Sequence, residues 1–298
     1  MAKTFEDLKK SQSIRQEILR KYGSVPTSIW KMSFAENKLV WDPRTRQAEV
    51  SFKNESMPNF MQKSFSSSGK TVRGKGKGQS TLPYDMAKRI VMFYSEKGNT
   101  VLNPTMGDPT SMTVVNQLNR NFIGYDISEE NFNINLELKE KLMGNKGQQI
   151  ISENKCFIDI YKKSSENMSE ITNNSVDMVF FSPPYWDTEF YGEEKEQLGF
   201  GKTYPDFLNG LGCIINETYR ILKPGKYCCI NINDFRKNGQ FYDFHIDTAN
   251  LMSKAGYKRY DTIIIMWANC IGQCFASQVE ERKATAKQHE YLIVGKKE

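Results

Sequence analysis

The chain has 298 residues and a formal net charge of +6, and 39 % of its residues are hydrophobic and 12 % aromatic. This composition supplies a sizeable core and excludes a wholly disordered chain, while the modest basic excess suits a polyanionic partner without requiring one. No apolar run approaches the ~20 residues of a membrane span, and the first residues, MAKTFEDLKK, lack the apolar core of a secretory signal. We therefore expect a soluble, cytoplasmic protein without a membrane partner.

The cysteines do not indicate disulfides or a metal site. They lack the density and spacing of a disulfide framework. The two closest candidates for zinc, Cys270 and Cys274, have no neighbouring His or Cys partners in the sequence. No bound metal is expected.

The N-terminal part of the chain has a mixed pattern. It combines a short helical pattern between Phe5 and Leu19 with extended segments at Lys38–Trp41 and Ala48–Phe52. A segment rich in Ser, Gly and Lys follows, from Ser64 to Ser80. It is either a solvated loop or a basic strap that contacts phosphates. The basic residues of this strap are Lys70, Arg73, Lys75 and Lys77.

Helices and strands alternate after Ser80. The predicted helices are Pro83–Tyr94, with Thr81 as a candidate cap, Pro109–Asn119, Asn131–Leu142, Tyr204–Leu222 and Phe244–Ala255. The predicted strands are Thr100–Leu102, Phe122–Asp126, Val176–Phe181, Tyr227–Ile232, Thr262–Met266 and Glu290–Gly295, with a Pro224-Gly225 turn before the fourth. This alternation predicts an α/β fold whose mainly parallel sheet is covered on both faces. Ligands of such sheets bind beyond the carboxyl ends of the strands.

Two loops at those ends have the chemistry of a nucleotide site. In the loop after Leu102, Gly107 permits an unusual turn, and Asp108 and Pro109 suit the start of a helix. The N–H groups at that helix start favour an anionic group such as an amino-acid carboxylate. Asp126 ends the next strand, where an acidic residue commonly accepts hydrogen bonds from ribose hydroxyls. An ordinary turn and a capping residue are the alternative interpretations.

The third loop, FFSPPYWD, follows a buried strand. Pro183 and Pro184 cannot continue the sheet, and their fixed φ angles make a rigid ledge. This ledge holds the acceptors of Ser182 and of the Pro183 carbonyl at the strand end, and Tyr185 and Trp186 offer flat aromatic faces. The arrangement favours a binding cleft over a simple connection.

The segment SPPYW resembles the catalytic motif of the DNA amino-methyltransferases. The resemblance extends, in the gamma order of motifs, through LPYDMAKRIVMFYSEKGNTVLNPTMG, NRNFIGYDIS, YRILKPGKYCCININD and HEYLIVGKK. It implies a Rossmann-like methyltransferase fold with a mixed seven-stranded sheet whose last strand is antiparallel, and S-adenosylmethionine as the cofactor. It also implies a catalytic domain at residues 80–298. Residues 1–79 form an extension before this domain, and their basic strap makes them a candidate DNA-contacting region.

The resemblance assigns roles to individual residues. Those implied to bind the cofactor are Thr81, Asn103, Thr105, Gly107, Asp126 and Asp159. Those implied to be catalytic are Ser182, Pro183, Pro184 and Tyr185. Those expected to contact DNA are Trp186, Tyr191, Lys202 and the four basic residues of the strap. The cofactor loop departs from the family pattern, because Asn103 stands in place of an aspartate and Pro109 in place of a glycine.

The resemblance implies methyl transfer to the exocyclic amine of a base flipped out of DNA. The serine of SPPY favours cytosine N4. The alternatives are an N6-adenine methyltransferase, a non-catalytic DNA-binding or partner subunit on the same fold, and an RNA or protein methyltransferase. Expected partners are DNA and either a second copy of the chain or a partner subunit. His245 and His289 are interpreted as structural, and restriction–modification is one of several open biological roles.

Overall fold

The computed structural model describes residues 16–18, 28–32, 37–42, 47–52, 82–143, 156–188, 194–199, 201–267, 281, 283–285 and 287–298. The strands of the main sheet are β1 (Ile29–Met32), β4 (Thr100–Asn103), β5 (Asn121–Asp126), β6 (Ile158–Lys162), β7 (Val176–Phe181), β8 (Leu222–Ile232), β11 (Lys258–Trp267) and β12 (His289–Lys296). The helices are α3 (Tyr84–Tyr94), α4 (Thr110–Gln117), α5 (Glu129–Leu142), α6 (Tyr204–Ile221) and α7 (Phe244–Lys254). Two hairpins, β2 (Asn37–Asp42) with β3 (Gln47–Phe52) and β9 (Phe235–Lys237) with β10 (Gln240–Tyr242), complete the described elements.

The main sheet has the order β1-β11-β12-β8-β7-β4-β5-β6. Its neighbouring strands are parallel except that β12 runs antiparallel to both β8 and β11. The predicted seven-stranded mixed sheet with an antiparallel last strand is therefore confirmed for the strands from β4 to β12. β1 adds an eighth strand beside β11.

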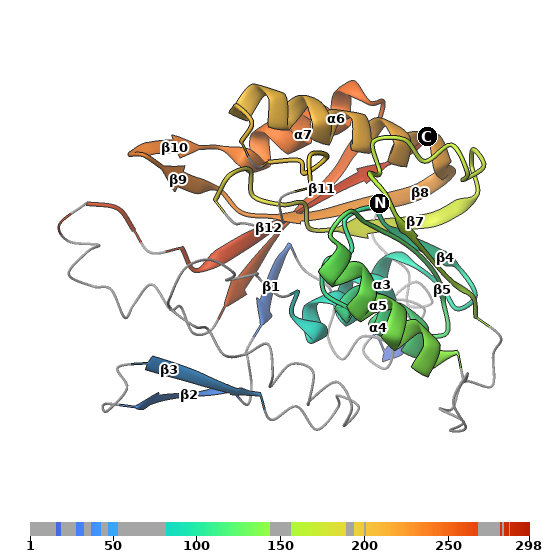
Figure 1. Cartoon of the computed structure of the whole chain (residues 1–298), viewed down its shortest axis with the longest axis horizontal. Helices are drawn as coiled ribbons and strands as arrows, with labels where there is room; N and C mark the ends of the chain where they lie inside the picture. Colours follow the sequence, from blue (N-terminus) through green and yellow to red (C-terminus); the bar gives the residue numbers. More distant parts are fainter. Residues whose placement is uncertain are drawn as a thin grey trace, which may run out of the picture.

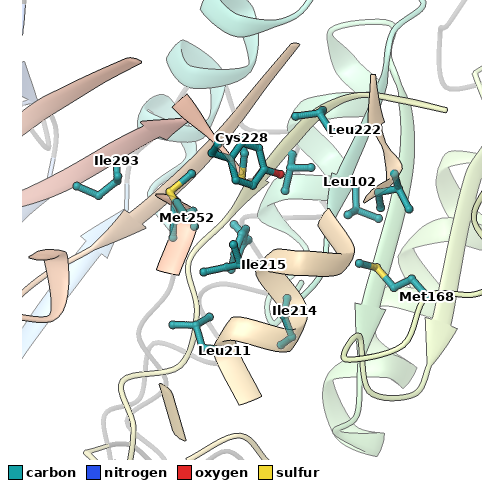
Figure 2. Packing of buried hydrophobic residues seen from close by; sticks show 14 of the residues in the cluster. Leu102, Met168, Leu211, Ile214, Ile215, Leu222, Cys228, Met252 and Ile293 are labelled. Carbon is teal, nitrogen blue, oxygen red and sulfur yellow. The ribbon is translucent and has the colours of Figure 1, made fainter. Parts of the chain in front are cut away.

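The helices cover both faces of this sheet, with α6 and α7 on one side and α3, α4 and α5 on the other (Figure 1). One hydrophobic core lies beneath each layer. Figure 2 shows the core under α6, where Leu211, Ile214 and Ile215 pack toward Leu102 and Cys228 of the sheet. Burial on both faces explains why the central strand β7 is buried at every position.

The one acidic residue of β7 has its own partners. Asp177 accepts hydrogen bonds from the Thr100 backbone N–H (3.0 Å) and from the Lys223 ammonium (2.8 Å). A carboxylate inside a sheet is costly unless it is paired and hydrogen-bonded. These two donors allow it to remain in an otherwise apolar strand.

The strand order reverses between β4 and β7, which is the point that positions the functional loops. The chain from β4 continues through β5 to β6 on one side, and β7 continues to β8 on the other. β4 and β7 are direct parallel neighbours, with Val101 opposite Met178 and Leu102 opposite Val179. Their carboxyl ends therefore open side by side, where ligands bind in open α/β sheets.

Two local details differ from prediction. β8 begins at Leu222 instead of Tyr227, because Leu222 already pairs with Val176 of β7. The predicted Pro224-Gly225 turn, with Gly225 at a φ of 77°, lies where the pairing with β7 is irregular, before it resumes at Tyr227. α3 begins at Tyr84 with Pro83 at the capping position, and the predicted cap, Thr81, lies outside the described residues. The backbone N–H of Leu82 donates to the Asp108 carboxylate (2.8 Å).

The β9–β10 hairpin was not predicted, although its sequence carries a hairpin signal. Asn238 and Gly239 form its turn with φ angles of 52° and 82°. Two consecutive positive φ angles are typical of the two-residue turn that Asn-Gly favours. The hairpin places additional aromatic residues beside the SPPY loop.

β1 belongs to the sheet although it lies in the predicted N-terminal extension. Its Trp30 is 1 % exposed, contacts the Phe93 ring edge-on at 6.2 Å and has the Arg89 guanidinium 4.7 Å from its ring centroid. The predicted boundary at residue 79 therefore falls between this strand and the sheet that it completes.

We predict that Trp30→Ala lowers the free energy of unfolding by about 3–5 kcal/mol, because it empties a fully buried aromatic site. Denaturant unfolding followed by circular dichroism measures this change. The neighbouring Ile29→Ala is the matched control, since Ile29 is 47 % exposed, and its cost should stay below about 1 kcal/mol. Equal costs for the two variants would show that Trp30 does not anchor β1 in the core.

Candidate active site

The loop after β4 is held by its own polar side chains. Asn103 is buried; its amide donates to the Ser111 hydroxyl (2.9 Å), and its side-chain oxygen accepts from the Thr105 N–H (3.0 Å). An aspartate here would lack the amide donor that links β4 to α4. The asparagine at this position therefore has a structural role in shaping the loop.

Gly107 links this loop to the next strand. Its φ of +55° lies in the left-handed region that glycine tolerates best. Its N–H donates to Asp126 (2.9 Å), and its carbonyl accepts from the Asn135 side chain on α5 (2.8 Å). These bonds tie the loop after β4 to the end of β5.

Asp126 stands at the carboxyl end of β5. One oxygen accepts from Gly107 and the other from the Ser128 N–H (2.8 Å). Burial raises the pKa of this carboxyl to about 6, against the lowering effect of the two backbone hydrogen bonds. A carboxylate has about four acceptor sites, so it can still accept from a bound ligand.

The SPPY loop meets the β4 loop directly. The Thr105 hydroxyl donates to the Ser182 carbonyl (3.2 Å), and Pro183 is buried beside it. Both loops line one cavity of about 160 Å³. The predicted residues that line it are Asn103, Thr105, Gly107, Asp126, Ser182, Pro183, Pro184 and Tyr185.

Asp159 is not part of this cavity. It is exposed at the second position of β6, opposite Ile123 of β5, whereas the cavity opens at the carboxyl ends of the strands. The segment that follows β6, residues 163–166, lines the cavity instead. The structure therefore does not bring Asp159 together with the other predicted cofactor residues, and its implied contact with the adenine amino group of the cofactor stays a prediction.

Trp186 makes its contacts with other residues of the protein. Its indole N–H donates to the Lys202 carbonyl (2.8 Å), and its ring packs against Tyr204 at 5.4 Å and Tyr242 at 5.3 Å. The Lys237 ammonium lies 4.4 Å from the ring centroid. Trp186 and Lys202 thus lie next to each other but do not line the cavity. Tyr191 and the four basic residues of the strap lie outside the described residues.

Sequence reasoning missed a polar pair in the cavity. Asn231, near the end of β8, and Glu290, at the start of β12, both line it. The Asn231 amide donates to Glu290 (2.7 Å), and the Trp267 indole N–H donates to the other carboxylate oxygen (3.2 Å). Their positions at the ends of predicted strands were the available signal, but only the antiparallel pairing of β12 with β8 brings them together.

The two histidines lie apart from this cavity. His245 contacts the buried Asp234 (2.6 Å) and stacks on Tyr291, and His289 meets the same ring edge-on. The described residues contain no group of three or more His, Cys, Asp or Glu side chains that could hold a metal ion. In the same part of the chain, no helix has the length and apolarity of a membrane span.

The cavity has the donors and acceptors that S-adenosylmethionine requires. Asp126 retains acceptor sites for ribose hydroxyls, and the loop from Asn103 to Asp108 lines the cavity beside it. The side-chain oxygen of Asn135 is buried without a hydrogen-bond partner among the described residues, directly behind Gly107. The residues present therefore fit this cofactor.

Three curated relatives match parts of the chain. Type II methyltransferase M.SfiI of Streptomyces fimbriatus is 29 % identical over 32 % of this chain, and M.XycI of Xanthomonas campestris pv. cyanopsidis is 38 % identical over 24 %. M.MthZI of Methanothermobacter thermautotrophicus is 29 % identical over 47 %. The matches span 21 %, 24 % and 44 % of these relatives' own lengths, in the same order.

Solved structures with similar folds include a SAM-dependent methyltransferase from Methanosarcina mazei. It is 12 % identical to this chain, with a TM-score of 0.47, and the match covers 74 % of this chain and 99 % of that one. A putative rRNA methylase from Clostridium thermocellum is 14 % identical, with a TM-score of 0.45 and coverage of 74 % and 100 %.

The family model described as DNA methylase, for the N6 and N4 methyltransferases, matches residues 2–137 and 176–298. Both functional loops that meet in the cavity lie inside these ranges. S-adenosylmethionine is the methyl donor that this family and fold imply. Because the match covers most of the chain, with the motifs in order along the sheet described above, the protein belongs to the DNA methylase family of N6/N4 methyltransferases.

Proposed function

We propose that this chain is an S-adenosylmethionine-dependent DNA methyltransferase that modifies N4 of cytosine. The main support is the hydrogen bond from Thr105 to the Ser182 carbonyl, which joins the two functional loops across one cavity. The cofactor would occupy the side formed by β4 and β5, and the target base the side formed by β7 and β8. In the proposed division of the chain, residues 80–298 bind both the cofactor and the target base, and residues 1–79 contribute DNA contacts.

On the cofactor side, Asp126 would accept hydrogen bonds from the ribose hydroxyls, and Asn103, Thr105 and Gly107 would surround the amino-acid part. When bound, the cofactor supplies a methyl group on a positively charged sulfur. The carboxylate at Asp126 and the shaped loop at Gly107 orient it toward Ser182. Thr81 remains a prediction for this side.

On the base side, the amine of the flipped base would lie against Ser182 and the Pro183 carbonyl. These acceptors would bind its two N–H groups and favour a more tetrahedral nitrogen, which makes its lone pair available for attack. The ring of Tyr185 would stack on the base. Tyr185 is held in place by the edges of Phe235 and Phe244, at 6.4 and 6.0 Å between ring centroids.

DNA is the proposed partner, and it must release the target base from its stack. Phosphate contacts are proposed for Lys202 and for the strap residues Lys70, Arg73, Lys75 and Lys77. Trp186 and Tyr191 remain proposed DNA contacts. The relatives are named Type II methyltransferases, which supports a proposed role in restriction–modification in the cytoplasm.

The test is incubation of the protein with labelled S-adenosylmethionine and genomic DNA of mixed sequence, followed by digestion and analysis of the nucleosides. We expect labelled N4-methylcytosine. Labelled N6-methyladenine would move the target to adenine on the same geometry. No label in DNA, together with no cofactor binding at millimolar concentration by calorimetry, would support a non-catalytic subunit. Label in RNA or protein instead would contradict the DNA substrate.

We predict that Tyr185→Ala lowers kcat/KM about 10- to 100-fold, because base–aromatic stacking contributes about 1–3 kcal/mol per base. Tyr185→Phe keeps the ring and serves as the matched control, with activity within about threefold of the unchanged protein. Methyl transfer to DNA under single-turnover conditions measures both. Normal turnover by the alanine variant would exclude base stacking on Tyr185.

We predict that cofactor affinity falls as the pH drops through about 6, the pKa of Asp126. Only the charged carboxylate can accept a hydrogen bond from each of two ribose hydroxyls, because the protonated form has an O–H group that must itself donate. Binding should therefore be level above about pH 7 and weaken by up to about tenfold for each pH unit well below 6. Calorimetric titration with S-adenosylmethionine across this range measures the dependence.

Asp126→Asn is the control for this pH dependence. An amide does not titrate here, so the variant should bind weakly at every pH and show a flat profile between about pH 5 and 7. The same slope in the variant as in the unchanged protein would assign the titration to another group.

A further inference from the structure

The cavity contains a carboxyl group that the proposed mechanism does not use. Glu290 accepts hydrogen bonds on both oxygens, from the Asn231 amide (2.7 Å) and from the Trp267 indole (3.2 Å). Its neighbour Asn231 is buried, and the side-chain oxygen of Asn231 has no hydrogen-bond partner among the described residues. A buried polar atom without a partner needs an explanation, and a ligand bound in the cavity supplies one.

This pair lies on the base side of the cavity. β7 and β8 are parallel neighbours, with Phe181 opposite Ile230, so Asn231 continues beside Ser182. Glu290 reaches Asn231 from β12 on the far side of β8. The loops after β4 and β5, which would hold the cofactor, lie on the opposite side of β7.

The surroundings of Glu290 favour its neutral form. Burial raises the pKa of its carboxyl. Among the described residues of the neighbouring segments, the ionisable side chains are Asp234, His245, Lys287, His289 and Tyr291. His245 lies 2.6 Å and Lys287 3.8 Å from Asp234, and His245 stacks on Tyr291. A protonated carboxyl has one O–H donor while its oxygens still accept. Glu290 can therefore keep both its partners and donate to a ligand.

The target base needs such a donor. Once its exocyclic N–H groups are bound, cytosine presents only the acceptors N3 and O2 on the same edge. Adenine presents the acceptor N1 beside its amine, whereas thymine presents an N–H donor at the equivalent ring position. A site built to hydrogen-bond one pattern discriminates strongly against a base that lacks it.

We infer that Glu290, held by Asn231 and Trp267, donates a hydrogen bond to the ring nitrogen next to the exocyclic amine of the target base. It is thus a specificity-determining residue that selects amino bases over thymine. The inference rests on the proposed function, because it requires a flipped base in this cavity.

The test removes each partner of this hydrogen bond in turn. The substrate is a duplex oligonucleotide that carries the methylated site found with genomic DNA, with either cytosine or 3-deazacytosine at the target position (adenine or 1-deazaadenine if adenine is modified). The deaza base replaces the ring nitrogen with a C–H group. The unchanged protein and Glu290→Ala are compared on both substrates by single-turnover methyl transfer and by fluorescence anisotropy of DNA binding.

We expect Glu290→Ala to lower the rate on the normal base about 10- to 100-fold, the effect of one lost hydrogen bond in a buried site. On the deaza base, Glu290→Ala and the unchanged protein should differ by less than about threefold, since the acceptor is already absent. Glu290→Gln keeps a neutral donor of the same size and should retain most activity on the normal base. Glu298→Gln, at an exposed position beyond the end of β12, is the control for removing a carboxylate.

Three results would overturn the inference. Equal losses from Glu290→Ala on the normal and deaza bases would show that the carboxyl does not contact the ring nitrogen. A Glu290→Gln variant as impaired as Glu290→Ala, with normal thermal stability and cofactor binding, would show that no neutral donor acts there. Failure of the unchanged protein to methylate any DNA would refute the proposed function itself, and this is seen before any Glu290 variant is compared.

Discussion

The reversal of strand order between β4 and β7 is the constraint on which the rest of the site depends. It leaves no helix between the carboxyl ends of these neighbouring strands, so the loops that follow them must meet. The Thr105–Ser182 hydrogen bond closes this junction. The two loops are then held at a fixed separation before any ligand binds. A fixed separation is the geometric condition for transfer of a group between a ligand on one loop and a ligand on the other.

The loops keep their shape because their polar groups satisfy one another in a partly buried setting. Asn103 bridges β4 and α4, Asp108 accepts from Leu82 and Thr110, and Asp126 accepts from Gly107 and Ser128. Desolvation raises the pKa of both Asp108 and Asp126. The departure from the family pattern at Asn103 is therefore compatible with an ordered loop, since the amide supplies a donor that a carboxylate lacks.

The side of the cavity formed by β7 and β8 is stiffened by aromatic packing. Trp186 adopts a positive φ of 43°, and a side chain on Gly199 would lie 2.0 Å from the Trp186 carbonyl oxygen, so only glycine permits this approach. The β9–β10 hairpin adds Phe235 and Tyr242 to the same cluster. Such a cluster limits the orientations of the SPPY loop, which matters because catalysis by positioning tolerates little displacement of the reacting groups.

The sequence by itself determined the central strands, the loops that follow β4, β5 and β7, and the family, because hydrophobic periodicity, glycine and proline positions and the SPPYW motif are local properties. Only the tertiary structure decided that β1 completes the sheet, that Asp159 does not line the cavity, and that Glu290 joins Asn231 in the cavity. Each of these depends on which strands pair and in which register. Pairing joins residues that are distant in the chain, so no local pattern records it.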